Sequence, residues 1–136
     1  MKHFLPCLVH VGVFVLVFAL AGVLIAQPGE SPMKQTKLQH VVLLKFKDGT
    51  TPEQLKKVET AFRGLKGKIP EIAALEWGTN NSPEQKNKGF THCFVLSFKS
   101  EKDREAYLPH PAHKAFGQVL GPVVADVLVI DFWAQD

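Results

Sequence analysis

A phenol and two imidazoles stand within one seven-residue segment, Tyr-Leu-Pro-His-Pro-Ala-His, which runs from Tyr107 to His113. An imidazole titrates near neutral pH and can accept a proton, while a phenol can orient or protonate an oxygen atom. These properties suggest His113 as a general base and Tyr107 as an orienting acid. The structural alternative is that His110 and His113 hydrogen-bond the free backbone groups of a helix junction.

The prolines of the same segment predict how it folds. Proline inside a helix removes a hydrogen bond and clashes with the preceding turn, whereas proline at the first helical position is well tolerated. We therefore expect one helix to end near Leu108 and another to begin near Pro111. Such a junction would hold Tyr107, His110 and His113 close together on a rigid corner.

Two further histidines lie in alternating strand patterns. His40 shares a strand face with Val42 and Leu44, and His92 shares one with Phe94. One interpretation is that both imidazoles form the polar lining of an apolar cavity, as is typical of ligand pockets. The other is that each is a core histidine bonded to a neighbour.

Large aromatic side chains could complete such a cavity. The candidate ligand-binding residues are His40, His92, His110, Phe62, Trp77 and Phe94. The alternative for the aromatic members is that they belong to the core or to contacts between subunits.

A metal site is also conceivable, because His110 and His113 have a spacing that lets two imidazoles share one ion on a helical turn. No third or fourth ligand follows at a characteristic spacing, and Asp126 and Asp131 could approach only through the fold. The chain carries no haem-attachment motif. We therefore predict no metal site and no cofactor.

The hydrophobic pattern predicts the element order β-α-β-β-α-β. Thr51, Pro52 and Gln54 are typical of a helix start with a capping box, and Gly67 and Pro70 are expected to end that helix. This order is the split β-α-β arrangement of the ferredoxin-like α+β fold. Strands are expected at residues 38–47, 72–78, 90–99 and 123–133. The helices should cover one sheet face, and a second subunit should cover the other, which is also partly apolar.

The N-terminal region has the pattern of a targeting segment. Residues 1–26 contain Lys2, then an apolar run from Phe4 to Ile25, then small residues, which predicts a secretory signal peptide and export to the periplasm or the extracellular space. If it is not cleaved, it would anchor the chain in a membrane, because the run approaches the ~20 residues that span a bilayer. Residues 27–37 are predicted to be a linker, and residues 38–136 one domain.

Charge and cysteine content narrow the class of protein further. The formal net charge is +3, and the 16 basic and 13 acidic residues are interspersed, so we expect no nucleic-acid partner. After removal of the leader only Cys93 remains, so no disulfide within the chain can stabilise the domain. Core burial and subunit pairing must hold the fold instead.

Five sequence stretches together resemble the stress-responsive A/B barrel domain family, whose members are also called dimeric α+β barrel proteins. The stretches are HVVLLKFK at 40–47, KGKIP at 66–70, GFTH at 89–92, YLPHPAH at 107–113 and VLVIDF at 127–132. They occur in order and span nearly the whole domain. The resemblance implies a homodimer whose two sheets form a barrel with the helices outside.

The resemblance also frames three hypotheses about function. Most members have no assigned activity, so the first is an exported homodimer that binds a small apolar ligand without assigned catalysis. A plant branch of the family cyclises polyketide chains without a cofactor, through a Tyr and a His whose positions match Tyr107 and His113 here. The strand histidine of that branch matches His40, which the resemblance makes a third catalytic candidate, as an auxiliary hydrogen-bond donor. The second hypothesis is therefore a cyclase or lyase acting on a carbonyl compound, although Phe62 stands where such an enzyme would want a polar residue. The third is a barrel monooxygenase.

Overall fold

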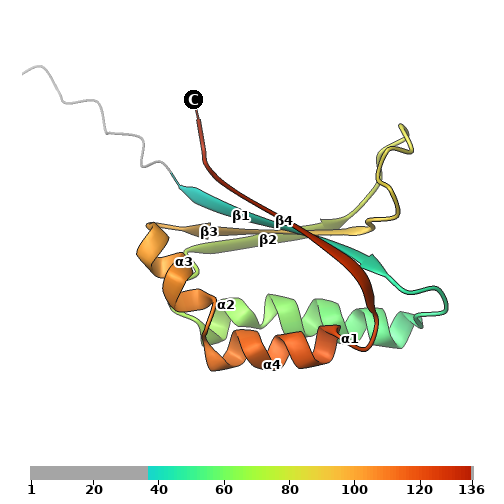
Figure 1. The fold of residues 1–136 in the computed structure, drawn as a ribbon, viewed down its shortest axis with the longest axis horizontal. Helices are drawn as coiled ribbons and strands as arrows, with labels where there is room; N and C mark the ends of the chain where they lie inside the picture. The colour runs from blue at the N-terminus through green and yellow to red at the C-terminus, as the bar shows by residue number, and fades with distance from the viewer. Residues whose placement is uncertain (1–36, 136) are drawn as a thin grey trace, which may run out of the picture. The chain divides into compact units, whose positions relative to one another are not determined.

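The computed structural model describes residues 37–135, so the predicted leader and most of the predicted linker lie outside the described residues. The elements alternate in the predicted β-α-β-β-α-β order, and each helical region is divided in two (Figure 1). The elements are β1 (Leu38–Phe46), α1 (Pro52–Arg63), α2 (Leu65–Lys68), β2 (Ala74–Thr79), β3 (His92–Phe98), α3 (Glu101–Tyr107), α4 (Pro111–Leu120) and β4 (Val124–Trp133). Within the described range, none of these helices is long and apolar enough to cross a membrane.

The four strands form one sheet in the order β2-β3-β1-β4, in which every neighbouring pair is antiparallel. This order and connectivity define the ferredoxin-like fold predicted from the sequence. The register places His40 of β1 opposite Leu96 of β3 and opposite Asp131 of β4. Because directly opposed residues point to the same side of a sheet, the fold brings Asp131 beside His40.

The helices lie against one face of the sheet, with α1 and α4 side by side beneath it (Figure 1). Alternate residues of β1 and β3 point toward them and are buried, as the period-two pattern predicts. The residues that face the helices are Leu38, His40, Val42, Leu44, His92, Phe94, Leu96 and Phe98. The opposite face, which we call the outer face, carries side chains such as Val41, Leu43 and Val95 that are only partly buried.

The start of α1 is the predicted capping box. The Thr51 hydroxyl accepts a hydrogen bond from the Gln54 amide at 3.3 Å, and the Gln54 side chain accepts one from the Thr51 amide at 2.9 Å. The helical region ends at Lys68, between Gly67 and Pro70 as predicted, but an interruption at Gly64 that was not predicted separates α1 from the four residues of α2. Gly64 keeps helical φ and ψ angles of −64° and −15°, and its amide donates to the Thr60 carbonyl at 3.0 Å, so the interruption is local.

The core lies between the sheet and the helices. Phe62 of α1 stacks on Phe94 of β3 with ring centroids 3.9 Å apart, and the edge of Phe116 from α4 meets Phe62 at 4.7 Å. Stacked and edge-to-face aromatic pairs of this kind stabilise a core beyond the area that they bury. These three rings fix α1 and α4 against the middle of the sheet and leave one end of it for the α3–α4 junction.

Candidate functional site

The predicted helix junction is present between α3, which ends at Tyr107, and α4, which begins at Pro111. His110 is the residue that caps α4, because its Nδ1 accepts a hydrogen bond from the Ala112 amide at 3.1 Å. Its own amide donates to the Tyr107 carbonyl at 3.1 Å. His110 therefore takes the structural role that the sequence left open, and it holds the corner on which Tyr107 and His113 stand.

The His113 ring packs on the Tyr107 ring, with centroids 4.3 Å apart. Its Nδ1 lies 2.9 Å from the carbonyl oxygen of Leu108. A carbonyl can only accept, so Nδ1 carries a hydrogen and donates it. In the neutral ring the lone pair is therefore on Nε2, which becomes the nitrogen available to take a proton.

Tyr107 joins the two imidazoles to each other. Its side chain is 1% exposed, and its ring meets the His40 ring at 5.6 Å and the Phe98 ring at 5.3 Å. Burial raises the pKa of the Tyr107 phenol well above its ordinary value, because the charged phenolate would be desolvated. The phenol, which is protonated at neutral pH even with an ordinary pKa, therefore keeps its proton further into the alkaline range and can donate a hydrogen bond to an oxygen.

His40 is held from its other side by a carboxylate. Its Nδ1 lies 2.7 Å from Asp131 Oδ1, and Arg104 Nη1 lies 3.5 Å from Asp131 Oδ2. The carboxylate accepts the Nδ1 hydrogen, which fixes the orientation of a ring that is only 5% exposed. We refer to His40, Tyr107 and His113 as the imidazole–phenol cluster, with Asp131 as the positioning residue for His40.

The contributions of Asp131 and Arg104 to this cluster were not predicted from the sequence. The sequence suggested Asp131 only as a distant metal ligand and gave no role to Arg104. One signal was available, since Asp131 interrupts the otherwise apolar run from Val127 to Trp133. Its partner is set by the β1–β4 register, which brings together residues 91 positions apart in the chain.

His92 of β3 lies apart from the cluster. Its partner in the register is Leu44, which is four residues along β1 from His40. Its Nε2 donates to Glu59 at 3.2 Å, its Nδ1 lies 2.9 Å from the Thr91 hydroxyl, and its ring edge meets Phe46 at 5.0 Å. Both ring nitrogens thus have protein partners. The structure places His92 as a hydrogen-bonded histidine that ties α1 to β3.

The predicted aromatic ligand residues occupy different surroundings. Phe62 and Phe94 are buried in the core, where they stack on one another. Trp77 is partly exposed on the edge strand β2, between the Phe94 ring at 5.6 Å and the Arg63 guanidinium at 5.6 Å. Arginine over an indole face is a favourable cation–π arrangement, so Trp77 covers the side of the core.

No group of three or more His, Cys, Asp or Glu side chains between residues 37 and 135 is arranged to hold a metal ion. The Nδ1 atoms of His110 and His113 are already bonded to backbone groups of the junction. The imidazole and phenol groups of the junction can offer proton transfer and hydrogen bonding.

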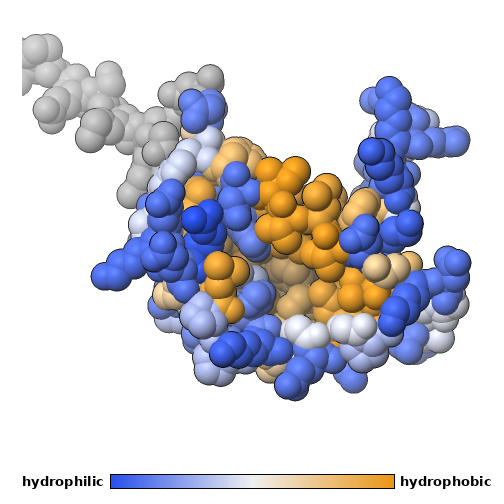
Figure 2. All heavy atoms as spheres, in the orientation of Figure 1, coloured by the Kyte–Doolittle hydropathy of each residue, from blue (hydrophilic) through white to orange (hydrophobic). Residues whose placement is uncertain are grey.

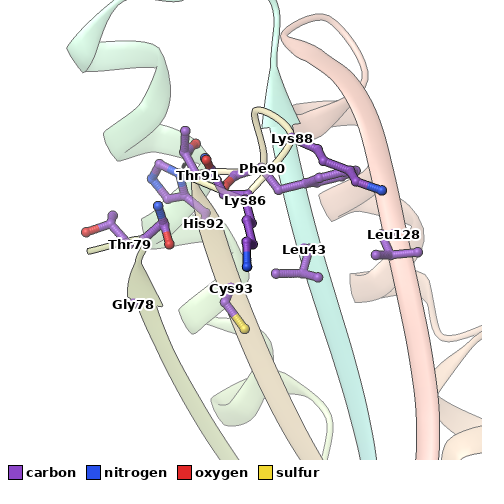
Figure 3. A pocket seen from close by; sticks show the side chains of 12 residues that line it. Leu43, Gly78, Thr79, Lys86, Lys88, Phe90, Thr91, His92, Cys93 and Leu128 are labelled. Atoms are coloured by element: carbon purple, nitrogen blue, oxygen red, sulfur yellow. Dashed lines mark hydrogen bonds between the residues drawn. The ribbon is translucent and has the colours of Figure 1, made fainter. Parts of the chain in front are cut away.

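A cavity of about 540 Å³ lies at the other side of the sheet, between the outer face and the loop of residues 80–91. Leu43, Cys93 and Leu128 extend from three neighbouring strands to form its floor (Figure 3). Of the ligand-binding candidates chosen from the sequence, His92 is the one that lines it. The other lining residues had little signal in the sequence, because residues 79–89 indicate only a polar loop.

The fold and the cluster define the class as a ferredoxin-like α+β domain with imidazole and phenol groups at a helix corner. Residues 38–134 match the family model described as the stress responsive A/B barrel domain, and the chain belongs to this family.

Three relatives illustrate the range of the family. The chain is 35% identical over 95 residues to the stress-response A/B barrel domain-containing protein HS1 of Arabidopsis thaliana, covering 70% of this chain and 87% of that protein. It is 30% identical over 95 residues to olivetolic acid cyclase of Cannabis sativa, covering 70% and 94%. A dimeric ferredoxin-like protein of unknown function from Thermobifida fusca superposes with a TM-score of 0.64 at 27% identity, covering 74% and 93%.

Proposed function

We propose that this chain forms a homodimer that binds a small, largely apolar molecule at the imidazole–phenol cluster. The observation that carries the proposal is the buried side chain of Tyr107, whose ring lies between the rings of His40 and His113. Binding sites for small molecules are mostly apolar and contain a few convergent polar groups. This cluster has that composition, so its ligand would present an oxygen acceptor, such as a carbonyl, from an apolar skeleton.

The homodimer is supported by the exposed surface of β4. Its large apolar residues are about half exposed, and they gather along the strand in Figure 2. Contiguous exposed apolar surface marks interaction sites, and an edge strand invites pairing with another chain. The Thermobifida fusca neighbour is described as dimeric, which supports the same arrangement.

Native mass spectrometry of the protein purified from its own source tests this proposal. We expect twice the mass of the mature chain and a retained small molecule, which is lost in the His113→Gln variant and kept in the Lys114→Gln variant. Lys114 is exposed on the same helix, so it controls for a general effect of substitution on α4. A dimer that never carries a molecule, under gentle conditions and with fresh protein, would contradict the ligand part of the proposal.

A second function is acid–base catalysis without a cofactor on the bound molecule. The favouring observation is that the Leu108 carbonyl takes the Nδ1 hydrogen of His113, which leaves Nε2 free to act as a base beside the acidic Tyr107. The 30% identity to olivetolic acid cyclase supports a carbonyl-containing polyketide as the substrate class. In this reaction His113 would remove a proton and Tyr107 would stabilise the developing oxygen charge. His40 would assist as a donor from Nε2 in its doubly protonated form, with Asp131 at Nδ1 as the counter-charge.

The linear polyketide precursor of olivetolic acid is a direct probe of catalysis. We expect cyclised product to form and its rate to fall about a hundredfold in His113→Gln, because general acid–base groups contribute on the order of 100-fold or more. Asp131→Asn should reduce the rate less, since Asp131 acts only through His40. If the wild-type chain forms no product, or if His113→Gln has full activity, the catalytic assignment fails while the binding proposal stands.

We also propose that residues 1–26 direct export of the chain. The support is the order of a positive start, an apolar run and small residues in the sequence. N-terminal sequencing of the protein from its own source should find a first residue near position 27. An intact Met1 in the cytoplasmic fraction would contradict export.

A further inference from the structure

The cavity on the outer face has an apolar floor and a polar, basic rim. Leu43, Leu128 and Phe90 supply apolar surface, and Lys86 and Lys88 come from the loop above them (Figure 3). Among its twelve lining residues two are lysines and none is acidic. Its volume of about 540 Å³ falls in the range of cavities that hold small organic molecules.

A third lysine reinforces the positive side of the cavity. Lys45 passes against Gly89, where an added Cβ would lie 2.9 Å from Lys45 Cε and 3.3 Å from Lys45 Nζ. Asp126 stands opposite Lys45 in the β1–β4 register. Glu84 pairs with Lys86 at 3.1 Å, where both side chains are largely exposed. An exposed pair of this kind is weak and exchanges readily, so Lys86 stays available to another anion.

The loop that carries Lys86 and Lys88 is held in a tight turn. Lys88 and Gly89 have positive φ angles of 49° and 83°, a conformation that costs energy for lysine. Asn87 holds the turn closed, because its carbonyl accepts from the Phe90 amide at 2.8 Å and its side chain donates to the Phe90 carbonyl at 3.0 Å. The Thr91 amide then joins the loop to β1 through the Leu44 carbonyl at 3.0 Å. These bonds preorganise the rim above the apolar floor.

We propose that this cavity binds an amphipathic organic anion, with its chain on the apolar floor and its carboxylate at the lysines. A medium-chain fatty acid has this chemistry. The apolar floor complements the chain of such a molecule, and the basic rim complements its carboxylate. A purely apolar molecule would leave the lysines without a partner, and a small anion would leave the apolar floor empty. Leu43, Cys93 and Leu128 lie on the outer face, so the second subunit of the proposed homodimer would close the open side over the bound chain.

Calorimetric titration of the protein, as the cell produces it, with decanoate and with decanol tests the proposal. We expect decanoate to bind and decanol to bind more weakly, because the alcohol lacks the charge. The double variant Lys86→Gln, Lys88→Gln should weaken decanoate binding by about fivefold or more, as two exposed ion pairs of ordinary strength would. It should leave decanol binding unchanged.

The matched control is the double variant Lys56→Gln, Lys102→Gln, which removes the same charge from exposed positions on α1 and α3. It should bind decanoate as the wild type does. Absence of decanoate binding, or equal losses in both double variants, would overturn the proposal. Lysine-dependent binding by a protein that light scattering shows to be a monomer would overturn only the homodimer. Binding at the imidazole–phenol cluster is tested separately, by the native mass spectrometry described above.

Discussion

Tyr107 is the residue on which the cluster depends, and it is also the only tyrosine in the chain. The ultraviolet absorbance of tyrosinate therefore reports this residue alone. Because burial raises the pKa of Tyr107 above its ordinary value of 10.0, we expect the folded protein to show no tyrosinate at pH 10. In denaturant the same absorbance should titrate near pH 10.

The raised pKa also predicts the direction of the stability change at alkaline pH. Above pH 10 the unfolded chain loses the Tyr107 proton while the folded chain keeps it, so the unfolded state binds fewer protons and stability falls as pH rises. The free energy of unfolding should thus decline from about pH 10 upward, and Tyr107→Phe should remove this part of the decline. A native titration midpoint at pH 10 would show that the phenol is in contact with solvent.

Asp131 holds His40 from β4, and its removal should be felt in stability. Asp131→Asn replaces the charged acceptor of a 2.7 Å hydrogen bond to a buried imidazole. We expect the free energy of unfolding to fall by about 1 to 3 kcal/mol, the usual range for a hydrogen bond to a charged group.

Asp126→Asn on the same strand is the matched control for Asp131. Asp126 is exposed, and its side chain accepts from the Val127 amide at 2.8 Å, a bond that asparagine can also make. Urea denaturation should show little change in this variant. Equal losses in the two variants would mean that Asp131 contributes only a surface charge.

At the scale of elements, the corner between α3 and α4 depends on an unusual cap. His110 caps α4 through its imidazole Nδ1, where Ser, Thr, Asp or Asn is usual. We expect His110→Ala to reduce the free energy of unfolding by about 1 kcal/mol, and His110→Asn to retain most of it. Urea denaturation measures both, and full stability of the alanine variant would contradict the capping role.

The elements that could be predicted from sequence are those governed by local rules. The capping box of Thr51 and Gln54, the Pro111 start of α4 and the faces of β1 and β3 all follow from residue type and spacing. The break at Gly64 was missed, because apolar residues continue at helical spacing on both sides of it. A single glycine lowers helix stability by only about 1 kcal/mol, so whether it interrupts a helix depends on the packing around it.

The parts of the site that escaped prediction depend on contacts distant in sequence. The link between His40 and Asp131 needs the β1–β4 register, and a one-residue slip in that register would send Asp131 to the outer face. The cavity likewise needs the loop of residues 80–91 to fold back over β1, β3 and β4. Neither relation is encoded in a local motif, which is why the Tyr-to-His segment was found from sequence and its partners were not.

At the scale of the whole molecule, helices cover only one of the two faces of the sheet. The helices cover one face of β1 and β3. In contrast, β4 lies at the sheet edge and exposes apolar side chains on both of its faces. The exposed members are Val127, Leu128, Val129, Ile130 and Phe132. A homodimer formed through this strand would bury them, and it would enclose the outer-face cavity by the same contact.

Ile130 is the position at which this arrangement is most sensitive, because it lies on the outer face and is 49% exposed. In a two-fold symmetric interface each substitution appears twice, so Ile130→Lys would place two unpaired charges in an apolar contact. We expect the dimer to weaken by about 3 kcal/mol, which is roughly a hundredfold in dissociation constant.

Leu108→Lys makes the same chemical change at the same exposure, since Leu108 is 47% exposed, but it lies at the end of α3. Light scattering at micromolar concentration should therefore find a dimer for the wild type and for Leu108→Lys, and a monomer for Ile130→Lys. Circular dichroism should be the same in all three, because neither side chain belongs to the core. A persistent dimer in Ile130→Lys would move the subunit contact away from the outer face. The cavity would then remain open, and decanoate binding should be unchanged in that variant.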